Sequence, residues 1–555
     1  MKILLILCLS SINLLNAKSF TEPDSVIFTS SNLPLVVINT HGHSIHNSYR
    51  IVADMGIINN PNGERNYLTD PFTDYNGKIS IEIRGSSSTM FDKKPYGFET
   101  QDSAGNNVNV SLLSMPKEND WVLYASYSDK TFLRNEIPYY LARSLGIYAS
   151  RTAFCELFIN GSYRGLYVLM EKIKQDKNRV DIAKLNPQDT TGIELTGGYI
   201  LKVDKPYDYG WQVNVDPLYG FDKTYYQYHD PDSVELAPQQ RAYIKDFMFK
   251  VESTLVSSNY ADTVNGYTKY LDVQSYVDYF LISEIAKSVD AYRFSFYMYK
   301  EKDDDGGKLH VGPIWDYDLA FANYGENVWE QPWKTSDWNA DITAWKRTYF
   351  MKRLFSDPNF KNKLKARWIE IRSGAFSTNN ILSFMSTTVN KINEARVRNF
   401  IKWPIIGVYV WPNYYIGATY EDDVTFLQGW IIQRLLWMDI ELTGTYLGTE
   451  HENKHDLNSF ELKQNYPNPF NPVTTIRYRI PEVISAKGRN LKVSLKVYDI
   501  LGNEIATLVD EEKSAGNYEV EFSQESSIRH LASGVYFYQL RSGNYLETKK
   551  MILLK

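Results

Sequence analysis

The chain has 555 residues, a length that predicts roughly two to four domains with sizeable cores. Its 60 lysines and arginines against 66 aspartates and glutamates leave a net charge of −6, and no long basic block occurs. This balance argues against a nucleic-acid-binding arm and against a basic membrane-surface patch. The 42 tyrosines suit half-buried positions of β-strands, with saccharide or protein contacts as the other interpretation.

Residues 1–17 read MKILLILCLSSINLLNA, a basic start followed by a short apolar run and small or polar residues up to Ala17. This pattern predicts a secretory signal peptide, because the apolar run is too short to cross a bilayer. No later window has the ~18 uninterrupted apolar residues of a transmembrane helix. Cys8 would leave with the signal, and Cys155 would then have no partner for an internal disulfide. The cores themselves must therefore stabilise the secreted protein.

The pattern of elements changes along the chain after the signal. Residues 25–125 alternate apolar and polar residues between Asn, Gly and Pro clusters, which predicts a β-rich lobe. A helix is expected over 128–146, with Ser128 or Asp129 as its N-cap and Gly146 at its end. The next segment predicts a hairpin around Asn160-Gly161.

The second half predicts a mostly helical lobe and then an all-β tail. Apolar residues recur at helical spacing in 237–255, 272–289 and 423–442. The polar stretch 446–463 has no sustained period and is expected to be a linker. Residues 464–555 contain six or seven short strands with regular turns, which is typical of a small β-sandwich. The expected fold class is α+β, with a β-rich lobe, a mostly helical lobe and this sandwich.

One turn in the β-rich lobe has the composition of an anion site. In IEIRGSSSTMFDKKPYGFET a strand runs into a Gly and Ser-rich turn, Gly85 to Ser88, and then into Lys93 and Lys94. Backbone N–H groups of such a turn, with Ser86 and Ser87, can cradle phosphate oxygens. A solvated hairpin of no function is the alternative.

Two carboxylates stand where a phosphoryl-transfer enzyme needs them. The helix predicted over 272–289 ends directly at Asp290, and two strands joined by a DDDGGK turn then lead to Asp316. A carboxylate at a helix end and a second one after a hairpin is the arrangement by which protein-kinase-like folds place the catalytic and the metal-binding acid. The competing interpretation makes Asp290 a helix-end residue and Asp316 a salt-bridge partner.

The main region resembles the CotH family of spore-coat and secreted kinases. The resemblance is carried in order by the segments IEIRGSSS, KKPYGFET, SLLSMPKENDWVLYASYSDKTFLRN, RTAFCELFINGSYRGLYVLMEKIKQDKNRVDIAKL, GGYILKVDK and GPIWDYDLAF. It implies a CotH kinase-like domain over 25–445 with an atypical two-lobe protein-kinase fold. It also implies that ATP and Mg²⁺ or Mn²⁺ are used to phosphorylate Ser or Thr of a protein substrate.

The resemblance also implies roles for individual residues. Lys94, or else Lys93, would bind the phosphates, Arg134 would line the phosphate side, and Glu171 would lie where the hinge meets the adenine pocket. Asp290 would orient or deprotonate the acceptor hydroxyl, as a general base does. Asp316 would bind the metal, with support from Asp318 or Asn323. Two departures are that no G-x-G-x-x-G loop occurs, and that Ser295 stands five residues after Asp290, where ordinary protein kinases have a metal-binding Asn.

The tail resembles the C-terminal sorting domain of type IX secretion cargo, through NYPNPFNPVTTIRY, VYDILGNEIATLV, AGNYEVEF and LASGVYFYQL. This resemblance implies export to the outer cell surface and a type IX secretion machinery partner. Two functions from different classes follow for the whole chain. It is expected to be a surface protein kinase, or else a surface adhesion or scaffold protein whose kinase-like region only binds.

Overall fold

The computed structural model describes residues 26–326, 331–342, 347–445, 447, 461–480, 491–500, 503–514, 516–523, 531–542 and 545–554. The expected signal peptide lies outside these residues, and so does most of the expected linker 446–463. The chain divides into two compact units, residues 1–446 and 447–555.

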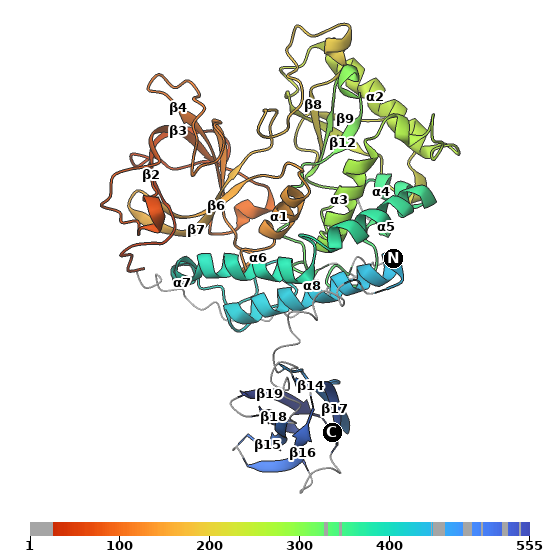
Figure 1. Ribbon diagram of the computed structural model, residues 1–555. Coiled ribbons are helices and arrows are strands. Elements are labelled where there is room, and N and C mark those ends of the chain that lie inside the picture. The colour runs from red at the N-terminus through yellow and green to blue at the C-terminus, as the bar shows by residue number, and fades with distance from the viewer. Residues whose placement is uncertain are drawn as a thin grey trace, which may run out of the picture. The chain divides into compact units, whose positions relative to one another are not determined.

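The first unit begins with a closed barrel of seven strands (Figure 1). Neighbouring strands are antiparallel except β1 and β6, which close the barrel as a parallel pair. The first region is therefore β-rich as expected, and it forms a barrel with no free sheet edge. In chain order the strands are β1 Leu35–Asn39, β2 Ile51–Ile58, β3 Tyr75–Ile83, β4 Tyr96–Gln101, β5 Asp120–Tyr124, β6 Thr152–Ile159 and β7 Ser162–Glu171.

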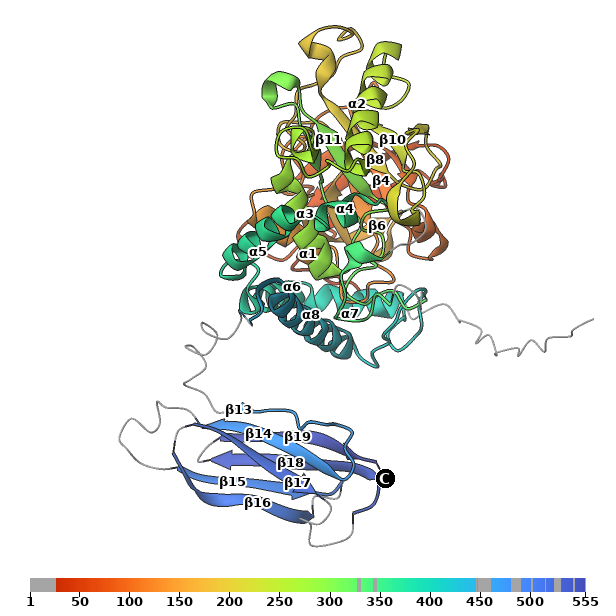
Figure 2. The ribbon, with the colours of Figure 1, turned by 90° about the vertical axis from the view of Figure 1, so that its right-hand side faces the viewer.

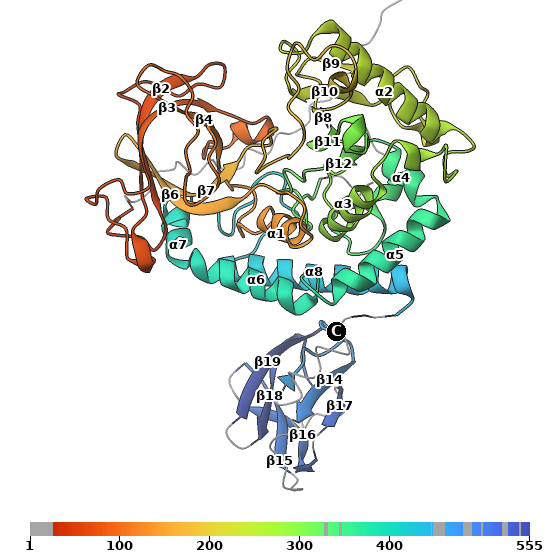
Figure 3. The same ribbon diagram turned by 45° about the horizontal axis from the view of Figure 1, so that its top comes forward.

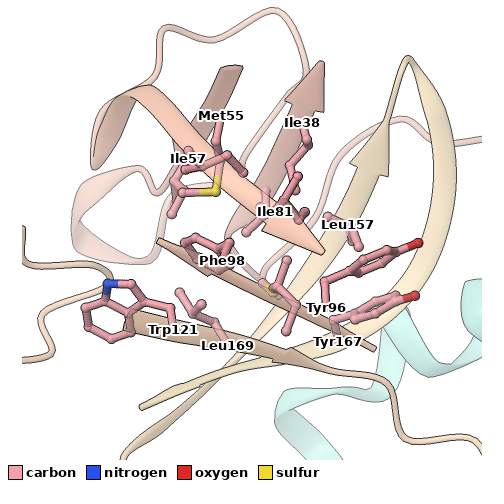
Figure 4. Packing of buried hydrophobic residues seen from close by; sticks show 14 of the residues in the cluster. Ile38, Met55, Ile57, Ile81, Tyr96, Phe98, Trp121, Leu157, Tyr167 and Leu169 are labelled. Atoms are coloured by element: carbon pink, nitrogen blue, oxygen red, sulfur yellow. The ribbon is translucent and has the colours of Figure 1, made fainter. Parts of the chain in front are cut away.

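The barrel is filled by every second residue of its strands, as the two-residue period of a β-strand requires. Phe98 and Trp121 from neighbouring strands lie in the buried cluster, and aliphatic side chains pack around them (Figure 4). Side chains at the intervening positions point out of the barrel. The labelled core residues are Ile38, Met55, Ile57, Ile81, Tyr96, Phe98, Trp121, Leu157, Tyr167 and Leu169.

Two local expectations in this region have different outcomes. The hairpin is confirmed: Asn160 and Gly161 join β6 to β7 with φ of 51° and 76°, the left-handed conformation that Asn and Gly tolerate. The expected helix start is wrong, because α1 covers only Glu136–Ser144. The Asp129 carboxylate instead bonds the backbone N–H groups of Thr131 and Arg134, and so holds a turn ahead of the helix.

A second sheet has the strand order β12-β11-β8-β10-β9. The expectation of a mostly helical second lobe is therefore wrong in part, because the segment between the barrel and residue 238 forms strands that pair with the later β11–β12 hairpin. This pairing joins segments about a hundred residues apart, which local patterns do not reveal. The strands are β8 Tyr199–Val203, β9 Gly210–Gln212, β10 Tyr225–Asp230, β11 Phe296–Lys300 and β12 Leu309–Val311.

Helices surround this sheet and extend beneath the barrel. The three predicted helices are confirmed as α2 Pro238–Val256, α3 Val273–Ala286 and α8 Tyr420–Thr443. Figure 3 shows α6 beneath the barrel and α1, and α8 continuing beneath α3, and α7 packs against β7. No helix among the described residues is long and apolar enough to span a membrane. The remaining helices are α4 Phe350–Phe355, α5 Pro358–Arg372, α6 Thr378–Lys391 and α7 Asn393–Lys402.

The second unit consists of a three-stranded sheet, β13-β14-β17, and a four-stranded sheet, β16-β15-β18-β19 (Figure 2). Ile476 and Phe522 of the first sheet share one buried cluster with Leu495 and Leu540 of the second. The predicted all-β tail is therefore confirmed. The strands are β13 Glu461–Leu462, β14 Val473–Ile480, β15 Leu491–Tyr498, β16 Glu504–Lys513, β17 Gly516–Ser523, β18 Gly534–Ser542 and β19 Tyr545–Leu553.

Candidate functional site

A cavity of about 370 Å³ lies between the outer face of the barrel and the second sheet. One wall is largely apolar, and the charged side chains come mainly from the ends of β3 and β8 and from the loops that follow α3 and β12. Both groups of residues lie in one unit of the chain. The apolar lining residues are Phe91, Pro95, Val122, Met170, Trp315, Leu319, Trp411 and Pro412, and the charged ones are Arg84, Lys202, Asp204, Lys205, Asp208, Asp290, Asp316 and Asp318.

The barrel wall follows from strand alternation. Trp121 and Leu123 of β5 point into the barrel core, so Val122 and Tyr124 between and after them face outward and line the cavity. On the neighbouring strand β7, Leu169 is in the core and Met170 lines the cavity. The register pairs Val122 with Met170, which places these two apolar side chains side by side.

The Gly and Ser-rich turn lies at the rim of the cavity, where Ser86 and Ser87 both line it. Gly85 has φ +110°, and a Cβ there would collide with the Ser88 hydroxyl, so only glycine fits this turn. The Lys205 ammonium donates to Ser86 Oγ at 3.1 Å, which brings a cation from the second sheet to this turn. The turn and the cation together form a surface suited to an anion.

Asp290 and Asp316 line the same cavity, although Asp316 lies 26 residues further along the chain. Asp290 follows the end of α3, where Lys287 closes the helix in a left-handed conformation. Its carboxylate accepts a hydrogen bond from Arg293 Nε at 3.2 Å. Asp290 is thus a residue at a helix end, and it also lines the cavity.

The Asp316 backbone is held in an uncommon conformation by contacts from the barrel side. Its φ is +64°, a region that L residues rarely adopt and that costs about 1–3 kcal/mol unless the surroundings fix it. The Asp316 N–H donates to the Tyr139 hydroxyl at 3.4 Å, and the Tyr317 N–H donates to Asn135 Oδ1 at 2.6 Å. These contacts tie the loop to α1 and its N-terminal flank.

Burial and neighbouring acids raise the pKa of two carboxyl groups in the cavity, those of Asp316 and Asp318. Burial, followed by the charges of Asp290 and Asp204, raises the pKa of Asp316 to about 6, and the weaker opposing influences are Arg84 and Lys205. Burial and then Asp316 raise the pKa of Asp318 well above its usual value. The Tyr124 hydroxyl contacts Asp318 Oδ2 at 3.5 Å. The cavity therefore has an excess of negative charge that a bound cation would relieve.

The structure does not bring Lys93 or Lys94 to the cavity. The Lys93 ammonium is buried under the barrel, where it donates to the carbonyl oxygens of Ser126 and Leu166 and to Asn399 Oδ1 of α7. Burial lowers its pKa well below the usual value. Lys94 Nζ donates to the Thr89 carbonyl oxygen at 2.7 Å. The phosphate-binding role expected for Lys93 is wrong in this structure because its three donors are already used.

Two other expected site residues serve the scaffold. Arg134 does not lie on α1; its side chain is buried, pairs with Asp129 at 2.7 Å and donates to the Ala320 carbonyl oxygen. Glu171 points away from the cavity that its neighbour Met170 lines, and it pairs with Arg151 at 2.9 Å.

Asn323 likewise has a structural role. Its Nδ2 donates to the Asp318 carbonyl oxygen at 2.8 Å, and its Oδ1 accepts from Asn413 at 2.9 Å. Both ends of the amide are thus engaged, which leaves Asn323 to hold the Asp318 loop rather than a metal ion. Of the two expected supporting residues, only Asp318 lines the cavity.

Five charged lining residues were missed from the sequence: Arg84, Lys202, Asp204, Lys205 and Asp208. The Arg84 guanidinium lies 5.6 Å from the centre of the Trp315 ring, so it reaches from the end of β3 to the residue before Asp316. Asp204 and Lys205 follow β8 directly. The signal was present in the segments IEIRG and LKVDK, but only the pairing of β8 with β11 shows that these charges meet Asp290 and Asp316.

The cavity residues fit a hard divalent cation in chemistry. Asp204, Asp290, Asp316 and Asp318 supply carboxylate oxygens, which Mg²⁺ and Mn²⁺ prefer. Within the described part of the chain, no three His, Cys, Asp or Glu side chains converge closely enough to form a ready-made metal site.

Comparison with known families agrees with this geometry. The family described as CotH kinase protein matches residues 81–438, and the chain belongs to this family. The description Secretion system C-terminal sorting domain matches residues 464–554, so the chain carries a sorting tail that directs it to the cell surface. A search of curated proteins found no match.

Proposed function

We propose that this protein is a secreted or cell-surface protein kinase that transfers the γ-phosphoryl group of ATP to Ser or Thr of a protein acceptor. One observation carries the proposal: Asp290, Asp316 and the Ser86–Ser87 turn line the same cavity although they come from three separate parts of the chain. Membership of the CotH family supports the same activity. The sorting tail supports a type IX secretion machinery as a partner during export.

On the acceptor side of the reaction, we assign the role of proton acceptor to Asp290. Its carboxylate would accept the hydrogen bond of the acceptor hydroxyl and orient its oxygen toward the γ-phosphorus. As the new O–P bond forms, the bond between the γ-phosphorus and the bridging oxygen breaks, ADP leaves, and the hydroxyl proton passes to Asp290. Arg293, which donates to Asp290 at 3.2 Å, would keep the carboxylate in position.

On the donor side of the reaction, we assign the positive side chains of the cavity to the phosphates and its remaining acids to a metal ion. Arg84 and Lys205, with the Ser86–Ser87 turn, would bind the phosphate oxygens in place of Lys94. Asp316 and Asp318 would hold Mg²⁺ or Mn²⁺. When bound, such an ion would neutralise part of the phosphate charge. The charges of Asp290 and Asp204, which raise the pKa of Asp316, support this assignment, since repulsion among acids favours a cation between them.

A binding module without catalysis is the second candidate, favoured by two observations. Asp290 already accepts a hydrogen bond from Arg293, and Lys94 donates to the Thr89 carbonyl oxygen instead of facing the cavity. A surface adhesion or scaffold protein would tolerate both. It would not need the raised pKa of Asp316, which costs stability and calls for a cation.

Labelled ATP distinguishes the two candidates. The full chain is incubated with γ-labelled ATP, Mn²⁺ and a Ser-rich acceptor protein, and label on protein is measured. We expect label with the wild type and none with Asp316→Asn or Asp290→Ala, while Asp304→Asn, in the exposed turn between β11 and β12, retains it. Equal label in all four proteins, or none in any, would favour the scaffold.

A further inference from the structure

Asn135 stands directly before α1, at the position where an asparagine side chain usually caps a helix. Here the side chain forms no capping hydrogen bond with the helix. Asn135 is only 6% exposed, and it lines the cavity together with the acids. Its amide group is therefore available for contacts outside α1.

The orientation of this amide is fixed by the loop that carries Asp316 and Asp318. The Tyr317 N–H donates to Asn135 Oδ1 at 2.6 Å, a bond that only the oxygen of the amide can accept. The two donors of Nδ2 therefore point elsewhere. Among the residues that the structure describes, none accepts a hydrogen bond from Nδ2. Because Asn135 is buried on its other sides, a partner can reach these donors from the cavity.

A group that accepts from Nδ2 would lie beside the proposed metal-binding acids. Tyr317, the partner of Oδ1, stands between Asp316 and Asp318, and Tyr139 of α1 accepts from the Asp316 N–H at 3.4 Å. A phosphate group suits this position, because its oxygens can bind a metal ion and an N–H donor together. The base and the sugar suit it less, since in phosphoryl transfer the metal ion bridges phosphate oxygens.

We infer that Asn135 is a further nucleotide-binding residue, whose Nδ2 donates a hydrogen bond to a phosphate oxygen of the donor nucleotide. This inference rests on the proposed function, in which Asp316 and Asp318 hold the metal ion. Arg84 and Lys205 reach the cavity from the ends of strands, whereas Asn135 reaches it from the start of α1. The two ends of one amide then have different partners, the acid loop for Oδ1 and the phosphate for Nδ2.

Two variants of the full chain remove the donor in different ways. Asn135→Asp keeps an oxygen that can accept from the Tyr317 N–H, but it replaces Nδ2 by a second oxygen with negative charge. Asn135→Ala removes the donor without adding charge. Asn109→Asp adds the same charge at an exposed position outside the cavity and serves as the control.

Binding is measured by calorimetry at pH 8 and equal Mn²⁺ with two probes. One is the non-hydrolysable β,γ-imido analogue of ATP, and the other is inorganic tripolyphosphate, which has no base or sugar. We expect both variants of Asn135 to raise both dissociation constants by about tenfold to a hundredfold, because a hydrogen bond to a charged group is lost. Asn109→Asp should leave both constants unchanged.

Two results of this titration would overturn the inference. Weakening of the ATP analogue without weakening of tripolyphosphate would show that Nδ2 donates to the base or the sugar. Unchanged constants in Asn135→Ala would show that the effect of Asn135→Asp is charge repulsion alone.

Binding of Mn²⁺ alone distinguishes a lost phosphate contact from a displaced acid loop. We expect Asn135→Asp to bind Mn²⁺ at least as tightly as the wild type, because the added carboxylate attracts a cation. If Mn²⁺ binding weakens in this variant as much as binding of the two probes, the loop has been displaced and the inference is overturned.

Transfer of label from γ-labelled ATP separates this inference from the proposed function. If the wild type binds both probes more tightly than Asn135→Ala but transfers no label, the proposed kinase fails and the inference stands. Label with the wild type, together with equal binding of the probes in both proteins, would keep the kinase and overturn the inference. Binding of neither probe by the wild type would overturn both.

Discussion

Buried acids have opposite surroundings in two regions of the molecule. The first region is the contact between the barrel and α7, the seam, and the second is the cavity between the barrel and the second sheet. In the seam, Glu156 is fully buried, and its carboxylate accepts from Arg398 Nε at 2.9 Å and from the Tyr163 hydroxyl at 2.6 Å. In the cavity, Asp316 is influenced more by the acids Asp290 and Asp204 than by any cation. In the seam, opposite charges hold α7 to the barrel, whereas in the cavity the acids repel one another.

The largest effect should come from the acid assigned to the acceptor hydroxyl. Asp290→Asn removes the proton acceptor with little change of shape, so kcat should fall by about 10²–10⁴ while KM for ATP changes little. Steady-state kinetics with varied ATP measures both. The same fall in Asp304→Asn, or a change confined to KM, would contradict the role given to Asp290.

Breaking the seam should cost stability. Glu156→Gln leaves the partly buried Arg398 guanidinium without its countercharge, and we expect unfolding to become easier by about 3–5 kcal/mol. Urea unfolding followed by fluorescence measures this change, with the exposed pair Lys250–Asp246 as the control through Asp246→Asn. A loss no greater than that of the control would show that the seam does not depend on this charge.

In the cavity, removing the charge of a buried acid is expected to increase the stability of the folded protein. Burial and neighbouring acids raise the pKa of Asp316 from 3.8 to about 6 in the folded protein, so its ionisation disfavours the folded state. Stability should therefore fall as the pH rises from about 4 to about 6, by at most about 3 kcal/mol. Asp316→Asn should be more stable than the wild type at pH 8 in EDTA and equal to it below pH 4. A destabilised variant at pH 8 would contradict unrelieved repulsion.

The smallest expected effect is a change in the affinity for ATP, which distinguishes between two candidate phosphate-binding residues, Arg84 and Lys94. Arg84→Met removes a charged contact worth about 1.5–3 kcal/mol, which should raise the dissociation constant of ATP about tenfold to a hundredfold. Lys94→Met loses only the contact with the Thr89 carbonyl oxygen and should leave that constant unchanged. Calorimetric titration with the β,γ-imido analogue compares them. The reverse order would return the phosphate role to Lys94.

Local patterns were enough for much of the fold. Asn160-Gly161 fixes its hairpin because both residues tolerate the left-handed conformation, and helices α2, α3 and α8 follow from apolar residues at helical spacing. The start of α1 was predicted too early, because Asp129 bonds its own local backbone and holds a turn instead. The all-β tail was recognisable from its strand and turn spacing.

The sequence alone also singled out Asp290 and Asp316, which line one cavity, because they follow a helix end and a hairpin strand. Only the tertiary structure decided which cations face them. Lys93 and Lys94 precede β4 and are turned to carbonyl oxygens, whereas Arg84 and Lys205 reach the cavity from the ends of β3 and β8. The physical reason is that the direction of a side chain at the end of a strand depends on barrel closure and on the pairing of β8 with β11, and both join residues far apart in the chain.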